Sequence, residues 1–436
     1  MTEYVLKLQE YGVAFGEKII LSGVNLKIPA KGNVVLLGPS GIGKSTLFRS
    51  ICGINYSNPT FRTWGKAFFA GELIDEFNQG PVLVSQNAKL MMSTILENVI
   101  SGLPERSNLQ KNQQIDLAKR LLDHAGLEEL SEKLMDNVIS LPLGQQRHLA
   151  ILRTSAANPK VLCIDEPTTN LDEKYITPIL EYISQESKKR AIITILHNQK
   201  HAKQLPGEVA LLSGGWINEY SSDKQFYQKP KSKAGKQFIK TGSCPSIGPR
   251  VVESDLVFVD KETIDLPPPI PEAAKKYVSD AFGPRNFLWL KKGILAGTPQ
   301  PGLVNDLSYD LRLLNKVGVT ILINLRKNKP DPSPMRQYEI KSLWFPITDM
   351  AAPGYDETIK WCQQVSEYLR CGEVIAYHCK AGLGRTGTML ACQLITEGQS
   401  ALEALEKVRQ IEPRWVQSEI QVNFLAQFEI FFKKNS

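Results

Sequence analysis

The segment that most constrains the fold is 378–387, which reads His-Cys-Lys-Ala-Gly-Leu-Gly-Arg-Thr-Gly and is rich in small residues. An apolar run predicts a buried strand over 373–377 directly before it, and the composition of 386–394 predicts a helix directly after it. A loop between a strand and a helix N-terminus presents backbone N–H groups that bind phosphate. The segment therefore predicts an α/β domain with an anion site near the C-terminal end of the sequence.

Two residues give this loop the chemistry of a phosphatase. The helix dipole, the loop amides and Arg385 all favour the thiolate of Cys379, which would attack phosphorus and form a cysteinyl-phosphate. Arg385 can hold two phosphate oxygens in a bidentate fork, a geometry that lysine cannot supply. Asp349, which lies 379 − 349 = 30 residues before the cysteine, is the predicted general acid, with Asp356 as the alternative. The hydroxyl of Thr386 could stabilise the departing thiolate.

On these motifs, residues 286–436 resemble the cysteine-dependent protein phosphatase superfamily, particularly the small atypical dual-specificity phosphatases. The match also covers 293–299, and it implies that Gln421 helps to position water. Lipid phosphatases related to tensin usually carry a second lysine where this chain has Leu383, so we expect a phosphorylated protein as substrate, with a phosphoinositide as the alternative. The resemblance implies a phosphate-binding loop formed by His378, Lys380, Ala381, Gly382, Leu383 and Gly384.

A second phosphate motif lies near the N-terminus. The apolar run 33–38 predicts a short strand, and 44–52 predicts a helix after a loop rich in Gly, Ser and Pro. The loop 38–45 satisfies the pattern G-x-x-x-x-G-K-[ST], in which Lys44 reaches the β and γ phosphates and Ser45 reaches magnesium. The backbone positions predicted to surround the nucleotide phosphates are Gly38, Ser40, Gly41, Gly43 and Thr46.

Two further apolar runs predict strands that end in polar residues. The run 161–164 ends at Asp165, which can hold the magnesium shell, and the adjacent Glu166 can orient or deprotonate the attacking water. The run 191–196 ends at His197. Strands that alternate with helical stretches in this way predict an α/β domain with a mostly parallel sheet.

In the order of these parts, residues 1 to about 245 resemble the ATP-binding cassette (ABC) superfamily. The resemblance implies that Phe15 stacks on adenine, that Gln86 contacts magnesium and water, and that 170–172 forms the D-loop. It also places His197 near the γ-phosphate. ATP with Mg²⁺ is therefore the expected cofactor, with a metal shell that comprises Ser45, Gln86 and Asp165.

One motif departs from the family pattern. The signature, normally Leu-Ser-Gly-Gly-Gln, reads Leu-Pro-Leu-Gly-Gln at 141–145. Pro142 has no N–H group and Leu143 adds bulk, so a composite site across a head-to-tail homodimer should close poorly. ATP binding is therefore a firmer expectation than hydrolysis, although a diverged but working signature stays open. The tail 226–242 resembles that of transporter subunits, for which a separate membrane permease would be the partner.

The length and composition define the domain organisation. A chain of 436 residues exceeds one ordinary hydrophobic core, so we expect an ABC-type domain at 1–245, a linker at 246–285 and a phosphatase domain at 286–436. The character changes over about 224–271, where 229–233 combines lysines with a proline and 266–271 is rich in proline, and this composition predicts an extended segment. The net charge of +7 is mild for this length, and the seven scattered cysteines predict reduced thiols.

Location and partners follow from what the sequence lacks. Without an apolar run of membrane-spanning length or a signal-peptide core, we expect a cytoplasmic protein, and nothing resembles a nucleic-acid recognition motif. Two hypotheses remain: a phosphatase governed by ATP occupancy, or a transporter-associated ATPase with an accessory phosphatase domain. A phosphate-binding module without catalysis is disfavoured by the joint presence of Asp349, Cys379 and Arg385.

Overall fold

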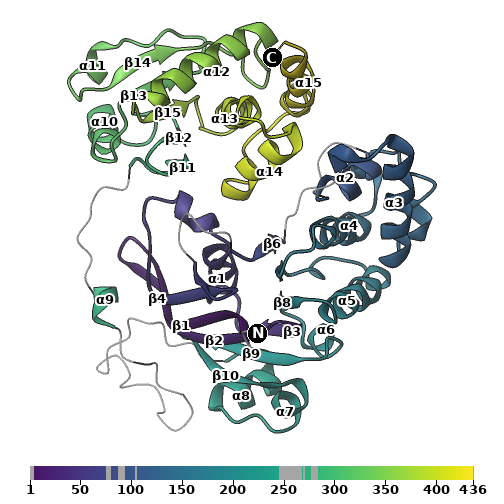
Figure 1. Cartoon of the computed structure of the whole chain (residues 1–436). Coiled ribbons are helices and arrows are strands. Elements are labelled where there is room, and N and C mark those ends of the chain that lie inside the picture. The colour runs from purple at the N-terminus through teal and green to yellow at the C-terminus, as the bar shows by residue number, and fades with distance from the viewer. Residues whose placement is uncertain are drawn as a thin grey trace. The chain divides into compact units, whose positions relative to one another are not determined.

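The computed structural model describes residues 4–74, 80–86, 94–103, 106–244, 268, 271–275 and 283–435. The chain divides into two compact units, one with Met1–Gly53 and Arg62–Tyr277 and the other with Ile54–Phe61 and Val278–Ser436 (Figure 1). The boundary between Tyr277 and Val278 falls within the predicted linker 246–285, most of which lies outside the described residues.

The first unit is built on the mostly parallel sheet that the apolar runs predict. All neighbouring pairs are parallel except β9 with β10, and the core strands β7 and β8 are buried along their whole length. The strand order is β10 (Trp216–Ser222), β9 (Glu208–Ser213), β3 (Gly32–Leu37), β8 (Ala191–Ile195), β7 (Val161–Asp165) and β6 (Val82–Val84). The predicted strand–loop–helix at 33–52 is confirmed, because β3 leads through the glycine loop into α1 (Lys44–Ile51).

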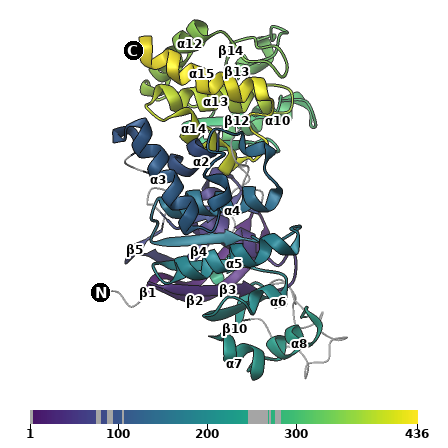
Figure 2. The same cartoon turned by 90° about the vertical axis from the view of Figure 1, so that its right-hand side faces the viewer.

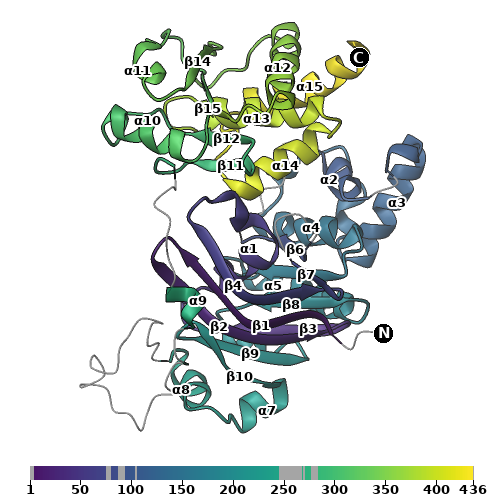
Figure 3. The same ribbon diagram turned by 60° about the vertical axis from the view of Figure 1, so that its left-hand side comes forward.

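This unit also contains a second, antiparallel sheet, which the sequence does not predict. Figure 3 shows its purple strands β1, β2 and β4 running together as one curved layer. Its order is β2 (Lys18–Pro29), β1 (Tyr4–Phe15), β4 (Phe61–Phe69) and β5 (Glu72–Leu73). The β1–β2 ladder shifts register at four points, so the alternation of buried and exposed residues that identifies a strand in a sequence is broken.

Helices complete the first unit around these sheets. The long ones are α3 (Lys111–His124), α4 (Leu143–Ala156) and α5 (Glu173–Ser187), and apolar side chains from all three enter one core cluster with the parallel strands. The shorter elements are α2 (Ile95–Ser101), η2 (Arg106–Asn108), η3 (Glu128–Leu130), η4 (Val138–Ser140), α6 (Gln199–Ala202) and α9 (Glu272–Lys275).

The expectation of an extended segment from Lys224 is wrong for its first part. The chain instead forms α7 (Asp223–Gln228) and α8 (Lys233–Thr241), which lie beside β10 (Figure 2). Phe226 and Phe238 are buried in the main core, whereas the lysines and the proline that suggested a linker occupy exposed positions or the connection between the helices. Residues 245–267 lie outside the described residues, so the expectation is not tested there.

The second unit is the predicted α/β domain. Its sheet is parallel except for the β11–β12 pair, and β15, which precedes the phosphate loop, is buried at its centre. The strand order is β11 (Leu288–Lys291), β12 (Leu295–Thr298), β15 (Ile375–His378), β13 (Ile321–Asn324) and β14 (Lys341–Trp344). The helices are η1 (Ile54–Ser57), α10 (Leu307–Lys316), α11 (Ser333–Arg336), α12 (Tyr355–Arg370), α13 (Gly384–Thr396), α14 (Ala401–Ile411) and α15 (Glu419–Asn435).

Within the described part of the chain, no helix combines the length and the apolar character needed to cross a membrane.

Candidate phosphatase and nucleotide sites

The phosphate loop lies where the central strand of the second unit meets its most buried helix. Cys379 follows the last residue of β15 directly and is only 3% exposed, and α13 begins at Gly384 with Arg385 in its first turn. The strand, loop and helix expected at 373–394 are therefore all present. The first-turn N–H groups of α13 lie at the end of the loop, an arrangement that stabilises bound anions.

Contacts from outside the loop fix its backbone. Gly382 has a φ of +73°, and a Cβ atom placed there would lie 2.6 Å from the backbone of Thr298 and Pro299. Only glycine fits this left-handed and crowded position without displacing the strand end. The indole N–H of the buried Trp415 donates a hydrogen bond of 2.9 Å to the Gly382 carbonyl. No local pattern identifies Trp415 as part of the site, because it lies 33 residues further along the chain than Gly382.

The structure brings four of the predicted phosphatase residues together. The Thr386 hydroxyl, fully buried, lies 3.3 Å from the Cys379 Sγ, to which it can donate. The guanidinium of Arg385 forms an ion pair of 2.9 Å with the carboxylate of Asp349, and it donates to the Ile347 carbonyl at 3.2 Å. The alternative acid, Asp356, lies exposed in the first turn of α12 and has no described contact with the loop.

His378 supports the cysteine from inside the sheet. Its Nδ1–H donates to the Cys379 carbonyl at 3.2 Å, and the ring is almost completely buried. Burial lowers the pKa of His378 to about 4, and the positive charges of Arg326 and Arg385 lower it further. The imidazole is therefore neutral near pH 7 and holds the loop as a hydrogen-bond donor.

The N-terminus of α15 fastens the acid loop. The side-chain amide of the fully buried Gln421 donates to the Ala351 carbonyl at 3.2 Å, and Ser418 Oγ donates to the Met350 carbonyl at 2.6 Å. Gln421 also lies against the start of α13, since a Cβ on Gly384 would come within 3.1 Å of its Oε1 atom. Its water-positioning role stays a prediction. No local pattern in the sequence distinguishes Ser418 as part of the site.

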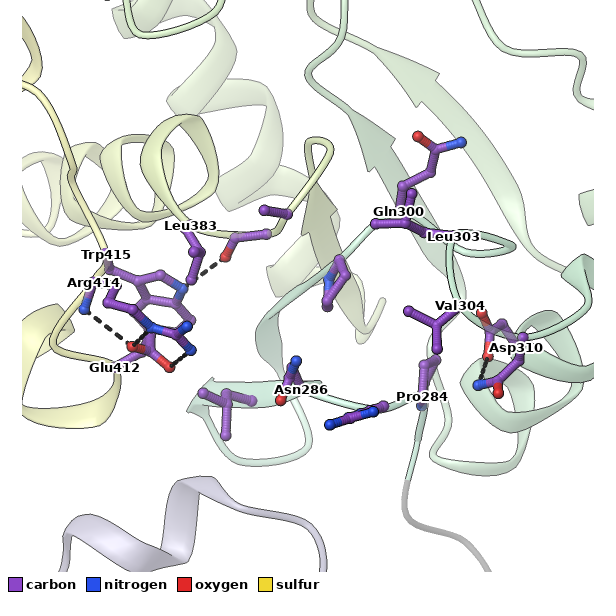
Figure 4. A pocket seen from close by; sticks show the side chains of 16 residues that line it. Pro284, Asn286, Gln300, Leu303, Val304, Asp310, Leu383, Glu412, Arg414 and Trp415 are labelled. Carbon is purple, nitrogen blue, oxygen red and sulfur yellow. Dashed lines mark hydrogen bonds and ion pairs between the residues drawn. The ribbon is translucent and has the colours of Figure 1, made fainter.

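A pocket of about 240 Å³ opens on the other side of the loop (Figure 4). Figure 4 shows the apolar side chains of Leu303, Val304 and Leu383 around it, with Arg414 paired to Glu412 at one end. Its remaining walls come from the chain around Pro284 and Asn286 and from Trp415. Ala381, Gly382 and Leu383 of the phosphate loop form one of its walls, whereas Cys379, Arg385 and Asp349 do not line it.

In the first unit, Lys44 lies buried in the glycine loop. Its ammonium donates to the carbonyls of Gly38 and Pro39, each at 2.8 Å, and only 4% of the residue is exposed. Burial lowers the pKa of Lys44 to about 8, although the carboxylates of Glu166 and Asp165 act in the opposite direction. A phosphate bound beside Lys44 would act in the same direction as these carboxylates and would favour the charged ammonium despite its burial.

The residues at the end of β7 fit a magnesium ion. Asp165 is 6% exposed, burial raises its pKa, and a hydrogen bond with Ser45 opposes that rise. Its Oδ1 atom is buried and has no hydrogen-bond partner among the described residues. A carboxylate oxygen and a serine hydroxyl are hard oxygen ligands, the type that Mg²⁺ prefers together with phosphate oxygens and water.

Glu166 is the centre of a side-chain network. Gln86 Nε2 donates to Glu166 Oε2 at 2.9 Å, Thr169 Oγ1 donates to the same atom at 3.0 Å, and His197 Nε2 contacts Glu166 Oε1. The backbone of Glu166 has a φ of +50°, an uncommon conformation for this residue type. The structure thus brings the predicted Gln86, Glu166 and His197 together.

The signature segment forms the start of α4. Pro142 occupies the N-cap position and provides no capping hydrogen bond, and the Leu143 side chain is exposed. Behind it, a Cβ on Gly144 would lie 2.2 Å from the Tyr175 ring, so this glycine allows α4 and α5 to approach closely. Phe15 lies at the end of β1 in a half-buried position, and its predicted stacking on adenine is not tested.

Comparison with known proteins divides the chain in the same way. Residues 21–169 match the family model described as ABC transporter, and residues 296–399 match the one described as polymorphic toxin system, DSP-PTPase phosphatase. The two models match separate parts of the chain, one on each side of the predicted linker.

The similar curated proteins match only the first half. The phosphate import ATP-binding protein PstB 2 of Bacillus licheniformis is 29% identical over 245 residues, covering 54% of this chain and 89% of that protein. PstB of Thermotoga maritima is 28% identical over 246 residues, covering 54% of this chain and 98% of its own. Among solved structures, cbiO1 from Clostridium perfringens is 24% identical with a TM-score of 0.45, covering 52% of this chain and 92% of that one.

Proposed function

We propose that this chain, in which an ABC-type ATP-binding domain is followed by a dual-specificity-type phosphatase domain, hydrolyses phosphomonoesters on phosphorylated proteins. The observation that carries the proposal is the gathering of Cys379, Thr386, Arg385 and Asp349 around one loop at a helix N-terminus. These residues come from two separate segments of the chain. Together they supply the nucleophile, the phosphate-binding guanidinium, the general acid and a hydroxyl that stabilises the thiolate.

In the first step, the Cys379 thiolate attacks phosphorus while Arg385 holds two of the phosphate oxygens. The bond between phosphorus and the substrate oxygen breaks, and the Asp349 carboxyl donates its proton to that leaving oxygen. The product is a cysteinyl-phosphate and a free hydroxyl group on the substrate. The Arg385–Asp349 ion pair holds this carboxyl group beside the guanidinium that binds the phosphate. A bound phosphate would take the place of the carboxylate on Arg385 and leave Asp349 free to carry the proton that it donates.

In the second step, water attacks the phosphorus of the cysteinyl-phosphate and transfers a proton to the Asp349 carboxylate. The sulfur–phosphorus bond breaks, inorganic phosphate leaves, and the thiolate of Cys379 is regenerated. The Thr386 hydroxyl, which lies 3.3 Å from that sulfur, stabilises the thiolate as it departs. Gln421 lies beside the start of α13, where it can orient the water.

For the first domain we infer binding of ATP with Mg²⁺. Lys44 would hold the nucleotide phosphates, and Ser45, Gln86 and Asp165 would hold the metal, which supplies charge neutralisation at the phosphates. We further propose that ATP occupancy governs the phosphatase. Cys244, the last residue described before 268, lies near enough to Lys44 for each to influence the pKa of the other, so this end of the described chain lies beside the nucleotide site.

A transporter-associated ATPase is the second candidate, and two observations favour it. The similar curated proteins are named phosphate import ATP-binding proteins, and Glu166 keeps its contacts with Gln86 and His197. This function would require a separate membrane permease and a head-to-tail dimer. ATPase activity that is stimulated by a copurified permease and lost in Glu166→Gln would establish it. Either function fits a cytoplasmic location.

Turnover of a phosphotyrosine peptide by the full chain tests the main proposal. Cys379→Ser should lower kcat by at least about a thousandfold, because the covalent step needs the thiolate. Cys371→Ser is the matched control, since Cys371 is an exposed free cysteine outside the loop and its replacement should leave turnover unchanged. Equal rates for wild type and Cys379→Ser would refute the catalytic assignment.

A further inference from the structure

Three polar residues follow the carboxyl ends of neighbouring strands at the phosphate loop. In the parallel ladders, Thr298 of β12 and Asn324 of β13 both pair with His378 of β15. Two residues further along each strand come Gln300, Arg326 and Lys380. The carboxyl ends of parallel strands are the edge at which α/β proteins bind ligands. The register thus places Gln300 and Arg326 on either side of Lys380, at the rim of the loop.

Hydrogen bonds hold the Arg326 side chain at this rim. Arg326 Nη1 donates to Gln300 Oε1 at 2.6 Å, and the Gln300 backbone N–H donates to the Lys380 carbonyl at 3.1 Å. The backbone of Arg326 is fixed as well, because its N–H donates to Asn324 Oδ1 and its carbonyl accepts from Trp344 Nε1, both at 2.8 Å. The guanidinium is therefore positioned before any substrate arrives, which reduces the entropy lost on binding.

The charges at this rim are not neutralised within the described part of the chain. Arg326 is half-buried, Lys380 is exposed, and neither forms an ion pair with any described residue. The charge of Arg326 also acts on His378, as does the charge of Arg385. A guanidinium with remaining N–H donors and no carboxylate partner is suited to an oxygen anion.

We propose that Arg326, supported by Lys380, binds a second acidic group of the substrate, namely a Glu or Asp side chain beside the phosphorylated residue of an extended peptide. Neighbouring strands lie about 4.8 Å apart, and successive residues of an extended peptide lie about 3.5 Å apart. Side chains two residues apart in an extended peptide point to the same face and lie about 7 Å apart, so a carboxylate at that spacing from the phosphorylated residue can reach Arg326. This inference rests on the proposed function and adds a preference for acidic sequences.

The test measures binding rather than turnover. Full-length Cys379→Ser protein is titrated, by fluorescence anisotropy, against two phosphotyrosine peptides that differ only in carrying Glu or Gln two residues before and two residues after the phosphotyrosine. The Glu peptide should bind about fivefold more tightly at low salt, and the difference should shrink as salt screens the charges. In the double variant Cys379→Ser, Arg326→Gln, the two peptides should bind with equal affinity.

Lys327→Gln is the matched control, because it removes the same charge from the next residue, which is exposed. It should keep the preference for the Glu peptide. Equal affinities of the starting protein for both peptides, or equal losses in Arg326→Gln and Lys327→Gln, would overturn the proposal. Tighter, Arg326-dependent binding of vesicles that contain a phosphatidylinositol phosphate would overturn it in favour of a membrane ligand. Loss of peptide turnover with an intact Glu preference would contradict the proposed function alone.

Discussion

His378 illustrates how a single buried side chain prepares the phosphate loop. Its ring donates to the Cys379 carbonyl, and its pKa is lowered to about 4, chiefly by burial. A neutral imidazole keeps one N–H for this bond, whereas a charged ring would be buried next to Arg385 and Arg326, both positive. The same residue that orders the nucleophile thus makes the folded domain sensitive to acid.

This predicts a pH dependence of stability. Because the folded pKa lies below the unfolded value of 6.5, the unfolded chain binds more protons, and stability is lost as pH falls from 6.5 towards 4. Between pH 7.5 and 5 the free energy of unfolding should fall by about 2 kcal/mol through this residue. His378→Asn should lose this part of the dependence.

Pulse proteolysis in urea, followed through fragments of α13, measures the second domain within the full chain. His378 is the only histidine in 278–436, so no other imidazole contributes to that transition. An identical pH dependence in wild type and His378→Asn would show that the ring is not buried neutral.

At the scale of elements, the strand–loop–helix unit depends on how closely its loop approaches the neighbouring strand. Gly382→Ala would combine a left-handed φ with a Cβ 2.6 Å from the backbone at Thr298. We expect a loss of kcat/KM of about a hundredfold or more, since a shift of about 1 Å in a catalytic loop has effects of that size.

Gly372→Ala separates the effect of a positive φ from the effect of a clash between a new Cβ atom and the neighbouring backbone. Gly372 also has a positive φ, of +84°, but a Cβ there meets nothing within 4 Å. It should cost about 1 kcal/mol of stability and leave kcat/KM unchanged. Comparable losses of kcat/KM in both variants would mean that the backbone conformation, and not the close approach to Thr298, limits the loop.

The elements that could be predicted from the sequence are those with local signals. The units β3–α1 and β15–α13 each combine an apolar run, a glycine loop and helical composition, and both were found. The β1–β2 ladder was missed because its bulges break the alternation. Helices α7 and α8 are not predicted, because the lysines and the proline around Phe226 and Phe238 are typical of an extended segment. The burial of these two phenylalanines depends on tertiary contacts.

The residues of the candidate site also divide into those with a local signal in the sequence and those without one. Cys379 and Arg385 can be identified from their spacing in the sequence, because the reaction requires both side chains at one phosphate and a single short loop carries both. Trp415 and Ser418 could not, since each acts through one hydrogen bond to a backbone carbonyl far away in the sequence. Any residue with a suitable donor could make such a bond, so the sequence carries no pattern for it.

At the scale of the whole molecule, the chain contains two loops of the kind that binds phosphate, alike in construction and different in chemistry. Each follows a buried parallel strand and precedes a helix, but one contains Lys44 and the other Cys379. At the start of α4 the signature segment has Pro142, which lacks an N–H group, and the exposed side chain of Leu143, and the proposal that ATP regulates the phosphatase starts from this departure.

Regulation of this kind predicts that MgATP changes the phosphatase rate. Coupling between two sites typically alters affinity by about 5- to 150-fold, so we expect at least a fivefold change in kcat/KM for a phosphopeptide on addition of MgATP. In Lys44→Ala the ratio of rates with and without MgATP should be one. A ratio of one in the wild type would show that the two domains act independently.

The central claim is that Cys379 carries the phosphoryl group during hydrolysis. The most direct measurement is acid quenching of the full chain during turnover of a phosphotyrosine peptide, followed by mass spectrometry of the fragment that contains Cys379. We expect one phosphoryl group on the Cys379 sulfur in wild type and none in Cys379→Ser. Continued turnover in Cys379→Ser, or turnover in wild type without a phosphorylated cysteine, would contradict the account.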